Sequence, residues 1–225
     1  MNSFIEIRNL NKTYRLDEVN FPVLKNLNLT LPQKKLITLM GPSGSGKSTL
    51  LNILSAIETS DSGEVYVDGD NLTGKTEKQL TLYRREKIGI VFQFFHLLSY
   101  LSALENTALP LYLNGHSKKE ALHKAEEALK TVGLEHRMKF TPKELSGGEK
   151  QRVAVARAIV HKPKLILADE PTGNLDSTAS DQIIKLFRNC VNDLGITVFM
   201  VTHNPEIGTI GDINLHILDG QIRNK

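Results

Sequence analysis

The stretch GPSGSGKS, residues 41 to 48, decides the fold. It matches the pattern G-x-x-x-x-G-K-[ST], which is typical of loops that bind phosphate groups between a strand and a helix. Both neighbours are present, because residues 35–40, KLITLM, have the continuous apolar pattern of a buried parallel strand and a helical pattern follows the loop. An ordinary Gly-Ser loop is the alternative, but it would require neither the Lys-Ser pair nor these flanking elements.

The residues of this loop suit phosphate binding. Its three glycines let the chain curl so that successive backbone N–H groups face one anion, and the helix beginning near Lys47 adds the positive end of its dipole. Lys47 is expected to reach the β- and γ-phosphates of a nucleotide, and Ser48 to place its hydroxyl on Mg²⁺. The residues expected around the phosphates are Gly41, Pro42, Ser43, Gly44, Ser45, Gly46, Lys47, Ser48 and Thr49.

Three further reactive side chains end apolar strands, where the ligands of parallel sheets bind. LILADE, residues 165–170, delivers Asp169, which suits the surroundings of Mg²⁺, and Glu170, which can accept a proton from a water aimed at the γ-phosphate. VFMVTH, residues 198–203, delivers His203, which could hold the γ-phosphate and orient Glu170. Solvated carboxylates and a passive histidine are the alternatives, and the phosphate loop in the same chain weakens both.

LSGGEKQRVAVARAI, residues 145–159, contains a second candidate anion site. Ser146, Gly147 and Gly148 precede a helix whose first turn can offer unpaired N–H groups. The chain has one Lys-bearing phosphate loop, so a second phosphate-binding helix start makes most sense if it serves a nucleotide held by another subunit. In a two-fold dimer with two nucleotides at its interface, each subunit would contact the nucleotide that the other subunit holds. Ser-Gly-Gly before a helix is also a common cap, and the residues alone leave both interpretations open.

Composition limits the class of protein. The 225 residues are enough for one large domain or two small lobes with a buried core. No apolar run approaches the roughly 18 residues of a membrane-spanning helix. The N-terminal MNSFIEIRNLNKTY alternates like a strand rather than a signal peptide, and the single Cys190 is expected to be a core thiol, so we expect a cytosolic protein. A net charge of +3 with scattered Lys and Arg argues against a dedicated nucleic-acid surface.

The order of the elements predicts an α/β fold. Strands that alternate with helices indicate a P-loop NTPase core with a mostly parallel sheet, to which an N-terminal antiparallel β flank and an inserted helical lobe are added. The core is expected at residues 1–93 and 161–225, and the helical lobe, which contains the Ser-Gly-Gly helix start, at residues 94–160.

Finer patterns predict individual elements. A polar linker near residues 15–22 is expected to separate two N-terminal strands, and a closing hairpin is expected around Asp219-Gly220. The sequence pattern of residues 117–133 predicts a helix that begins with a capping box of Ser117 and Glu120 and ends at Gly133.

The chain resembles the ATPase subunits of ATP-binding cassette (ABC) transporters across essentially the whole of residues 1–225. Three motifs carry the resemblance: LSGGEKQ at 145–151, LILADEPTGNLD at 165–176 and VTH at 201–203. The resemblance implies a single ABC ATPase domain that binds ATP and Mg²⁺, hydrolyses ATP and dimerises with a second copy of itself. It also implies site residues. Tyr14 would stack on adenine, Gln93 would contact Mg²⁺ and the attacking water, and His203 would act as the switch histidine. The partner copy's nucleotide would be contacted by Ser146, Gly147, Gly148, Glu149 and Asp176.

Two stretches, EPTGNLDS at 170–177 and HLLSYLSALENTALPL at 96–111, are similar to one subgroup of that family. It contains the bacterial lipoprotein-releasing, macrolide-export and cell-division ATPases. This implies a separately encoded integral membrane permease, a location on the cytoplasmic face of the inner membrane and no nucleic-acid partner, while the cargo stays open. Two residues depart from the family pattern, Glu149 where Gln is commoner and Asn204 where Asp is usual.

A soluble ABC ATPase that acts on DNA or on the ribosome is the alternative function. The related DNA-acting proteins interrupt the ATPase with long coiled coils, and no sustained heptads occur in this chain. The ribosomal proteins carry two cassettes in one chain, whereas this chain has one phosphate loop. Both features favour the transporter.

The apolar stretch QFFHLLSYLSALENT, residues 93–107, has two possible uses. Its side chains could simply pack the helical lobe. Because the stretch is attached to Gln93, it is also where a helix of the membrane subunit should dock. The residues expected to contribute to that docking groove are Phe94, Phe95, Leu97, Leu98 and Tyr100.

Overall fold

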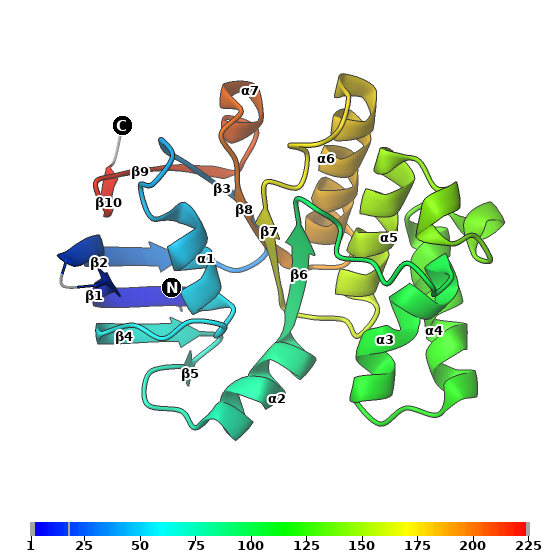
Figure 1. Ribbon diagram of the computed structural model, residues 1–225, viewed down its shortest axis with the longest axis horizontal. Helices are drawn as coiled ribbons and strands as arrows, with labels where there is room; N and C mark the ends of the chain where they lie inside the picture. Colours follow the sequence, from blue (N-terminus) through cyan, green and yellow to red (C-terminus); the bar gives the residue numbers. More distant parts are fainter. Residues whose placement is uncertain (1–2, 18, 224–225) are drawn as a thin grey trace. The chain divides into compact units, whose positions relative to one another are not determined.

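The computed structural model describes residues 3–17 and 19–223. The chain divides into two compact units, one that runs to Arg84 and resumes at Thr197, and a second from Arg85 to Ile196. Figure 1 shows their helices and strands coloured along the sequence. Both units combine strands with helices, and three of the strand pairings, β3 with β8, β3 with β9 and β6 with β7, are parallel. The predicted α/β fold with a mostly parallel core is therefore confirmed, whereas the division at residues 93 and 161 stays a prediction.

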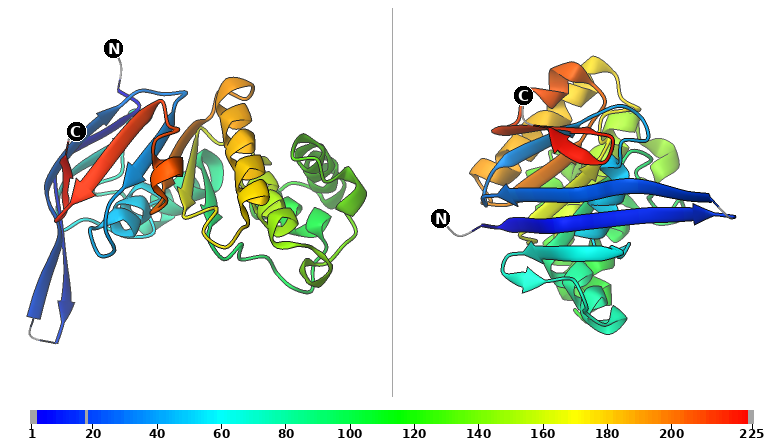
Figure 2. Two further views of the ribbon diagram at one scale, coloured as in Figure 1. Left: turned by 90° about the horizontal axis from the view of Figure 1, so that it is seen from above. Right: turned by 90° about the vertical axis from the view of Figure 1, so that its left-hand side faces the viewer.

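The first unit contains an antiparallel sheet, as predicted for the N-terminal flank. Its strands lie in the order β2-β1-β4-β5, with these bounds: β1 Ile5–Leu16, β2 Val19–Leu31, β4 Ser62–Val67 and β5 Asp70–Asn71. The predicted polar linker at 15–22 is wrong, because β1 extends to Leu16 and β2 already begins at Val19, and the two long strands are paired there with Tyr14 opposite Phe21 (Figure 2). Polar side chains are compatible with strands there, because these residues are exposed to solvent and need no apolar side chains.

The same unit contains the parallel strands on which the phosphate loop depends. β3 (Leu36–Met40) pairs in parallel with β8 (Thr197–Val201) on one side and with β9 (Ile213–Leu218) on the other. All five side chains of β8 and four of β3 are buried, as expected from their apolar runs. β10 (Gln221–Arg223) completes the predicted hairpin, whose turn residues Asp219 and Gly220 both have positive φ.

Three helices complete this part of the chain. α1 (Lys47–Leu54) follows the phosphate loop and contacts both β2 and β8, so it packs on strands of both sheets. α7 (Pro205–Gly208) follows β8. α2 (Glu77–Lys87) begins in the first unit and ends in the second, and the sequence pattern did not reveal it because only Leu80 and Tyr83 of its side chains are buried.

The second unit places four helices around two parallel strands. β6 (Ile88–Phe92) pairs with β7 (Leu165–Asp169), and α5 (Gly147–Ile159) packs on β6 and on α6 (Ser177–Asn192). α3 (Ala103–Leu113) and α4 (Lys118–Thr131) pack on each other and on α5 (Figure 1). Two short 3₁₀ helices, η1 (Glu135–Arg137) and η2 (Pro142–Glu144), lead to α5.

The predicted start of α4 is half right. Ser117 is its N-cap, and its side chain accepts a hydrogen bond from the Glu120 backbone at 3.3 Å. The Glu120 side chain does not return the bond, because its carboxylate pairs with His116 at 2.8 Å and Lys124 at 2.9 Å. The capping box is therefore wrong, and the predicted end of the helix is confirmed by Gly133, whose φ is 70°.

Within residues 3–17 and 19–223, no helix is long and apolar enough to cross a bilayer.

Candidate nucleotide-binding site

The phosphate loop in the first unit presents a helix start that no side chain caps. Gly46 is the N-cap of α1 with φ 102°, and no side-chain hydrogen bond is made at this cap. The Lys47 ammonium lies 2.9 Å from the carbonyl oxygens of both Gly41 and Pro42, so the side chain folds back over the loop. The positive end of the helix dipole and a lysine ammonium thus meet in one loop, which is the arrangement that phosphate binding requires.

Close packing at two positions of this loop leaves room for glycine only. A Cβ added to Gly41 would lie 2.3 Å from the carbonyl oxygen of Ile217, and one added to Gly46 would lie 2.7 Å from Leu24 Cδ2. The Ser45 hydroxyl is buried and has no hydrogen-bond partner in the described part of the chain. A buried polar atom normally has a partner, and a phosphate oxygen would supply one. The residues of the loop therefore fit a bound phosphate group.

His203 lies at the same sheet edge as this loop. β3 and β8 are parallel, and the Thr202 backbone N–H donates to Leu39 at 3.1 Å, so Gly41 and His203 follow neighbouring strand ends. Asn204 then caps α7, and its side-chain oxygen accepts bonds from the backbone N–H groups of residues 206 and 207 at 2.8 and 3.3 Å. Asn and Asp cap helices about equally well, which accounts for Asn204 in place of Asp.

Tyr14 lies near the phosphate loop on β1. Lys12 is paired across the hairpin with Leu24, the residue that lies against Gly46. Tyr14 lies two residues further along β1, about 7 Å at the usual rise of a strand. Its side chain is 38 % exposed, and its hydroxyl donates to Glu58 at 3.1 Å. The first unit thus brings together the phosphate loop, His203 and an exposed aromatic ring.

The second unit brings together another set of predicted site residues. β6 and β7 are in register with Phe92 opposite Asp169, so Gln93 and Glu170 follow neighbouring strand ends. Glu170 adopts a left-handed backbone conformation with φ 49°, which is strained for a residue with a side chain. Such strain concentrates at functional sites. Asn174 donates to the Gln93 carbonyl at 3.1 Å, a contact that the sequence did not reveal.

Two side chains of α5 hold the backbone next to these residues, and neither was predicted. Gln151 is fully buried, and its amide donates to the carbonyl of Pro171 at 2.7 Å and to that of Phe92 at 3.3 Å. Arg157 donates to the carbonyls of residues 95 and 96 at 2.8 and 2.6 Å. The sequence signal for both residues was a polar side chain among apolar residues of α5. It did not reveal their hydrogen-bond partners, because these partners lie far away in the sequence.

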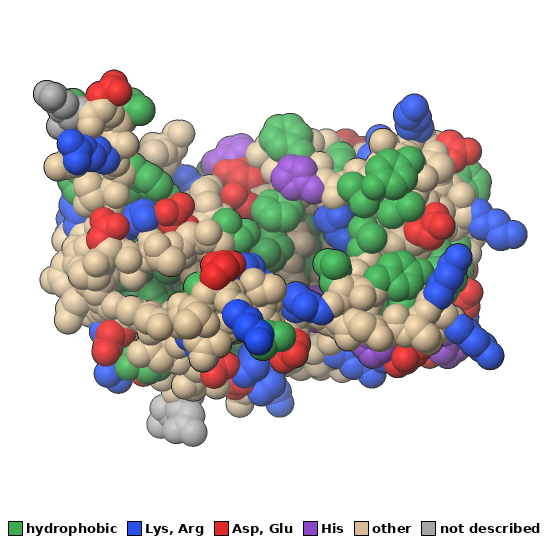
Figure 3. Space-filling view, turned by 60° about the horizontal axis from the view of Figure 1, so that its bottom comes forward, with side chains coloured by type: hydrophobic (Ala, Val, Ile, Leu, Met, Phe, Trp, Pro, Cys, Tyr) green, Lys and Arg blue, Asp and Glu red, His purple; other side chains and the backbone are tan. Residues whose placement is uncertain are grey.

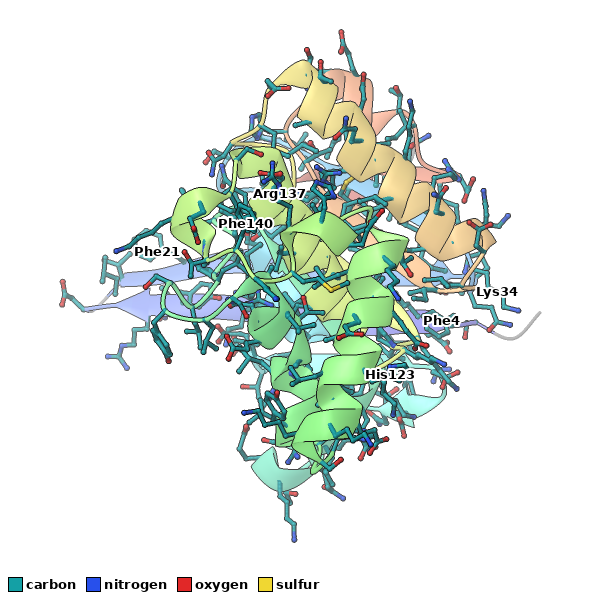
Figure 4. The ribbon with its side chains drawn as sticks, turned by 90° about the vertical axis from the view of Figure 1, so that its right-hand side faces the viewer. Phe4, Phe21, Lys34, His123, Arg137 and Phe140 are labelled. Carbon is teal, nitrogen blue, oxygen red and sulfur yellow. The ribbon has the colours of Figure 1, made fainter. Side chains whose placement is uncertain are left out.

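The predicted second anion site is the start of α5. The Ser146 hydroxyl accepts from the Glu149 backbone at 3.2 Å, and the Glu149 carboxylate accepts from the Ser146 backbone at 2.8 Å. Arg137 also donates to Glu149 at 2.8 Å, and its guanidinium lies over the Phe140 ring (Figure 4). The bond from the Ser146 backbone, with help from Arg137, lowers the pKa of Glu149. Glu149 in place of Gln is thus a paired, charged member of a capping box.

The remaining residues predicted for the partner's nucleotide lie against α6. A Cβ added to Gly148 would lie 3.0 Å from the Ala179 side chain, and one added to Gly147 would lie 3.5 Å from Leu175. Asp176 is the N-cap of α6 and accepts from the Ala179 backbone at 2.8 Å. The second unit therefore brings the starts of α5 and α6 together, as a common binding surface would require.

The predicted docking residues differ in exposure. Phe94, Leu98 and Tyr100 are exposed, by 67 %, 38 % and 76 %, whereas Phe95 and Leu97 are half-buried. Figure 3 shows several hydrophobic side chains exposed on one face of the molecule. Fully buried Asn106 holds the segment, because its side-chain oxygen accepts from the Leu98 backbone at 2.8 Å and its amide donates to the Leu98 carbonyl at 3.1 Å.

Comparisons with known proteins agree with these motifs. A family model described as ABC transporter matches residues 24–173. The chain is 44 % identical to the uncharacterized ABC transporter ATP-binding protein YvrO of Bacillus subtilis, over 97 % of this chain and 95 % of that protein. It is 42 % identical to the lipoprotein-releasing system ATP-binding protein LolD of Geobacter metallireducens, over 99 % of both. The dimeric post-hydrolysis structure of the ATP-binding cassette MJ0796 with ADP and Pi is similar, with TM-score 0.89, 40 % identity, and 98 % of this chain and 97 % of that one covered.

Proposed function

The chain belongs to the ABC transporter family as an ATP-binding domain, and on this premise we propose that it is the ATP-hydrolysing subunit that drives a separate membrane permease. Members of this family hydrolyse ATP, and the resemblance to the lipoprotein-releasing subgroup is confirmed. The observation that carries the proposal is the phosphate loop, in which the uncapped helix start, Lys47 and the buried Ser45 hydroxyl converge.

The first unit supplies the proposed contacts to the triphosphate and the base. Lys47 and the loop N–H groups bind the β- and γ-phosphates, and Tyr14 stacks on the adenine. Ser48, together with Asp169 and Gln93, would hold Mg²⁺, and the ion would neutralise charge on the phosphates. The described residues contain no group of three or more His, Cys, Asp or Glu side chains placed to hold an ion. Mg²⁺ is usually bound through one or two carboxylates together with substrate phosphates, and the proposed set of ligands contains one carboxylate, that of Asp169.

Hydrolysis is assigned to side chains at strand ends. Glu170 accepts the proton of the attacking water, Gln93 orients that water, and His203 contacts the γ-phosphate. The left-handed backbone of Glu170 and the bond from Asn174 to the Gln93 carbonyl support these roles, because both restrict where the two side chains can lie.

A second copy of the chain is the proposed partner at the nucleotide. The starts of α5 and α6 would contact the ATP of that copy, through Ser146, Gly147, Gly148, Glu149 and Asp176. The similar structure of MJ0796 is dimeric, which supports this arrangement. ATP favours the closed dimer more than ADP does, and that difference can do work on a partner.

The proposed second partner is an integral membrane permease. It would dock on the segment that contains Phe94, Phe95, Leu97, Leu98 and Tyr100 and hold the chain on the cytoplasmic face of the inner membrane. The exposure of three of these side chains and the lipoprotein-releasing relative support this docking site.

Two variants test the proposal. Glu170→Gln should stop turnover but bind ATP and form a dimer in gel filtration, because the general base is lost and the phosphate contacts are kept. Lys47→Ala should lose ATP binding and stay monomeric. A Glu170→Gln variant that binds ATP but stays monomeric, both alone and with the permease, contradicts the dimer, and unchanged ATP affinity in Lys47→Ala contradicts the phosphate loop assignment.

A further inference from the structure

We propose that Lys12 is a positioning residue that holds the Tyr14 ring in place for stacking on the nucleotide base. The inference rests on the proposed role of Tyr14 in the nucleotide site. Lys12 itself would touch neither the base nor the phosphates, and it would act through the ring.

The position of Tyr14 explains why its ring needs support. The ring is 38 % exposed and lies on the long β1–β2 hairpin, where its cross-strand partner Phe21 is also exposed. An exposed ring on a two-stranded hairpin is free to sample other rotamers unless its neighbours hold it. Stacking on a base requires one orientation.

Two contacts fix this orientation. The Tyr14 hydroxyl donates to Glu58, and the Lys12 ammonium lies 5.3 Å from the ring centroid, within the range of a cation–π interaction. Lys12 and Tyr14 are two residues apart on one strand, so their side chains project from the same face of the sheet. The ring is therefore restrained both at its hydroxyl and by the neighbouring ammonium.

Lys12 is itself fixed to a degree that is rare for a lysine. It is 8 % exposed, and its ammonium contacts Glu58 at 2.7 Å, the Thr59 carbonyl at 2.8 Å and Asp61 at 3.7 Å. Burial opposes its charge, but the bond to Glu58 and the charges of Glu58 and Asp61 outweigh that effect and raise the pKa of Lys12. Lys12 is therefore a charged anchor, held at hydrogen-bond distance by the Glu58 carboxylate and the Thr59 carbonyl and paired more loosely with Asp61.

The anchor connects the ring to the helix of the phosphate loop. The segment 57–61 begins shortly after the end of α1 at Leu54, and the backbone N–H groups of Ile57 and Glu58 donate to the Asn52 carbonyl of that helix at 2.9 and 3.2 Å. Lys12 therefore links the strand that carries Tyr14 to the chain that continues from the phosphate-binding helix. This linkage sets the spacing between the base platform and the phosphates before the nucleotide arrives, and binding then costs less entropy.

The test separates base recognition from phosphate recognition. Lys12→Met keeps most of the stem but removes the ammonium, and calorimetry would measure its Kd for a non-hydrolysable ATP analogue and for inorganic tripolyphosphate. Ordering a free side chain weakens binding by roughly 3- to 10-fold, so the Kd for the ATP analogue should rise by about this factor. The Kd for tripolyphosphate, which has no base, should not change.

Arg8→Met is the matched control. Arg8 is on the same strand, its guanidinium lies 5.2 Å from the Tyr66 ring, and it pairs with Glu6 and Glu64. This variant also removes a paired cation from an aromatic ring, but away from the site, and both Kd values should stay at their wild-type level. Equal weakening of both ligands in Lys12→Met, or equal loss of ATP-analogue affinity in the control, would overturn the proposal.

A double-mutant cycle tests whether Lys12 acts through the ring. In a Tyr14→Leu background, Lys12→Met should cause no further loss of ATP-analogue affinity, whereas a full additional loss would overturn the positioning role. Should Lys12→Met fail to fold, Glu58→Gln weakens the same contacts and should show the same selective loss, and an unchanged Kd would overturn the proposal. A wild-type protein that binds tripolyphosphate but gains no affinity from the base refutes Tyr14 stacking, and one that binds neither ligand refutes the nucleotide site itself.

Discussion

Replacing Gln151 with leucine should separate two effects of this buried amide, one on stability and one on catalysis. Its amide donates to the carbonyls of Pro171 and Phe92, at 2.7 and 3.3 Å, and its own oxygen has no partner among the described residues. Leucine has a similar volume, so no large cavity forms. Leaving the Pro171 carbonyl without its donor costs about 1–3 kcal/mol, and the loss at the Phe92 carbonyl costs less, because that carbonyl is only part-buried and also accepts from the Phe95 backbone at 3.4 Å. Removal of the unpaired oxygen returns about 1 kcal/mol, so the free energy of unfolding should fall by about 2 kcal/mol.

The catalytic effect follows from where these carbonyls lie. Phe92 precedes Gln93 and Pro171 follows Glu170, so the amide of Gln151 fixes the backbone on both sides of the proposed reaction centre. A misplacement of about 1 Å can cost roughly 100-fold in rate, so kcat should fall by about 10- to 100-fold. The KM for ATP should change little, because the variant leaves Lys47 and Tyr14 in place.

Urea unfolding and steady-state ATPase assays measure the two effects. Gln182→Leu is the matched control, because Gln182 is exposed on α6 and surface changes usually stay within about 0.5 kcal/mol. A Gln151→Leu protein that loses no more stability than the control would refute the assigned hydrogen bonds. A variant that loses stability but keeps the wild-type kcat would show that Gln151 supports the fold without positioning the reaction centre.

Two further predictions concern the ionisable side chains of Cys190, which is buried, and His161, which is half-buried. Burial raises the pKa of Cys190 to about 12 from 9.0, so the folded protein should react with a thiol reagent at pH 8 at least about a thousandfold more slowly than the urea-unfolded chain, and comparable rates would contradict its burial. Burial also lowers the pKa of His161, although the Ile88 carbonyl opposes this. The unfolded pKa is about 6.5, so the stability from neutral His161 is present above that pH and is lost as the pH falls through the folded pKa. The loss of unfolding free energy from pH 7.5 to 5.5 should therefore be smaller in His161→Gln than in the wild type, and equal losses would contradict this assignment.

The parts of the site that could be predicted from the sequence are those in which chemistry and local structure share one short stretch. The phosphate loop joins glycines, a lysine and a helix start within eight residues, and its surroundings match that pattern. Likewise, the apolar runs before Asp169 and His203 predicted buried parallel strands, because strands buried on both faces are typically apolar at nearly every position.

The parts that could not be predicted depend on partners distant in the sequence. Tyr14 and Glu58 are 44 residues apart, and Gln93 and Asn174 are 81 apart, so no local pattern links them. The polar hairpin residues near Arg15 suggested a linker because exposed strands on a two-stranded hairpin need no apolar alternation. The α2 helix was missed for a similar reason, since few of its side chains are buried.

The apolar segment after Gln93 has exposed side chains, while its backbone is bound by a side chain of α5. Phe95 and His96 have φ values of 58° and 47°, a left-handed conformation that costs roughly 1–2 kcal/mol per residue. Arg157 of α5 binds both of their carbonyls and stabilises this turn, while Phe94 is left exposed. The same helix begins at the proposed contact with the partner's nucleotide. Through Arg157, the backbone of the Phe94 segment is therefore bound to the same helix whose first residues form the proposed contact with the partner's nucleotide.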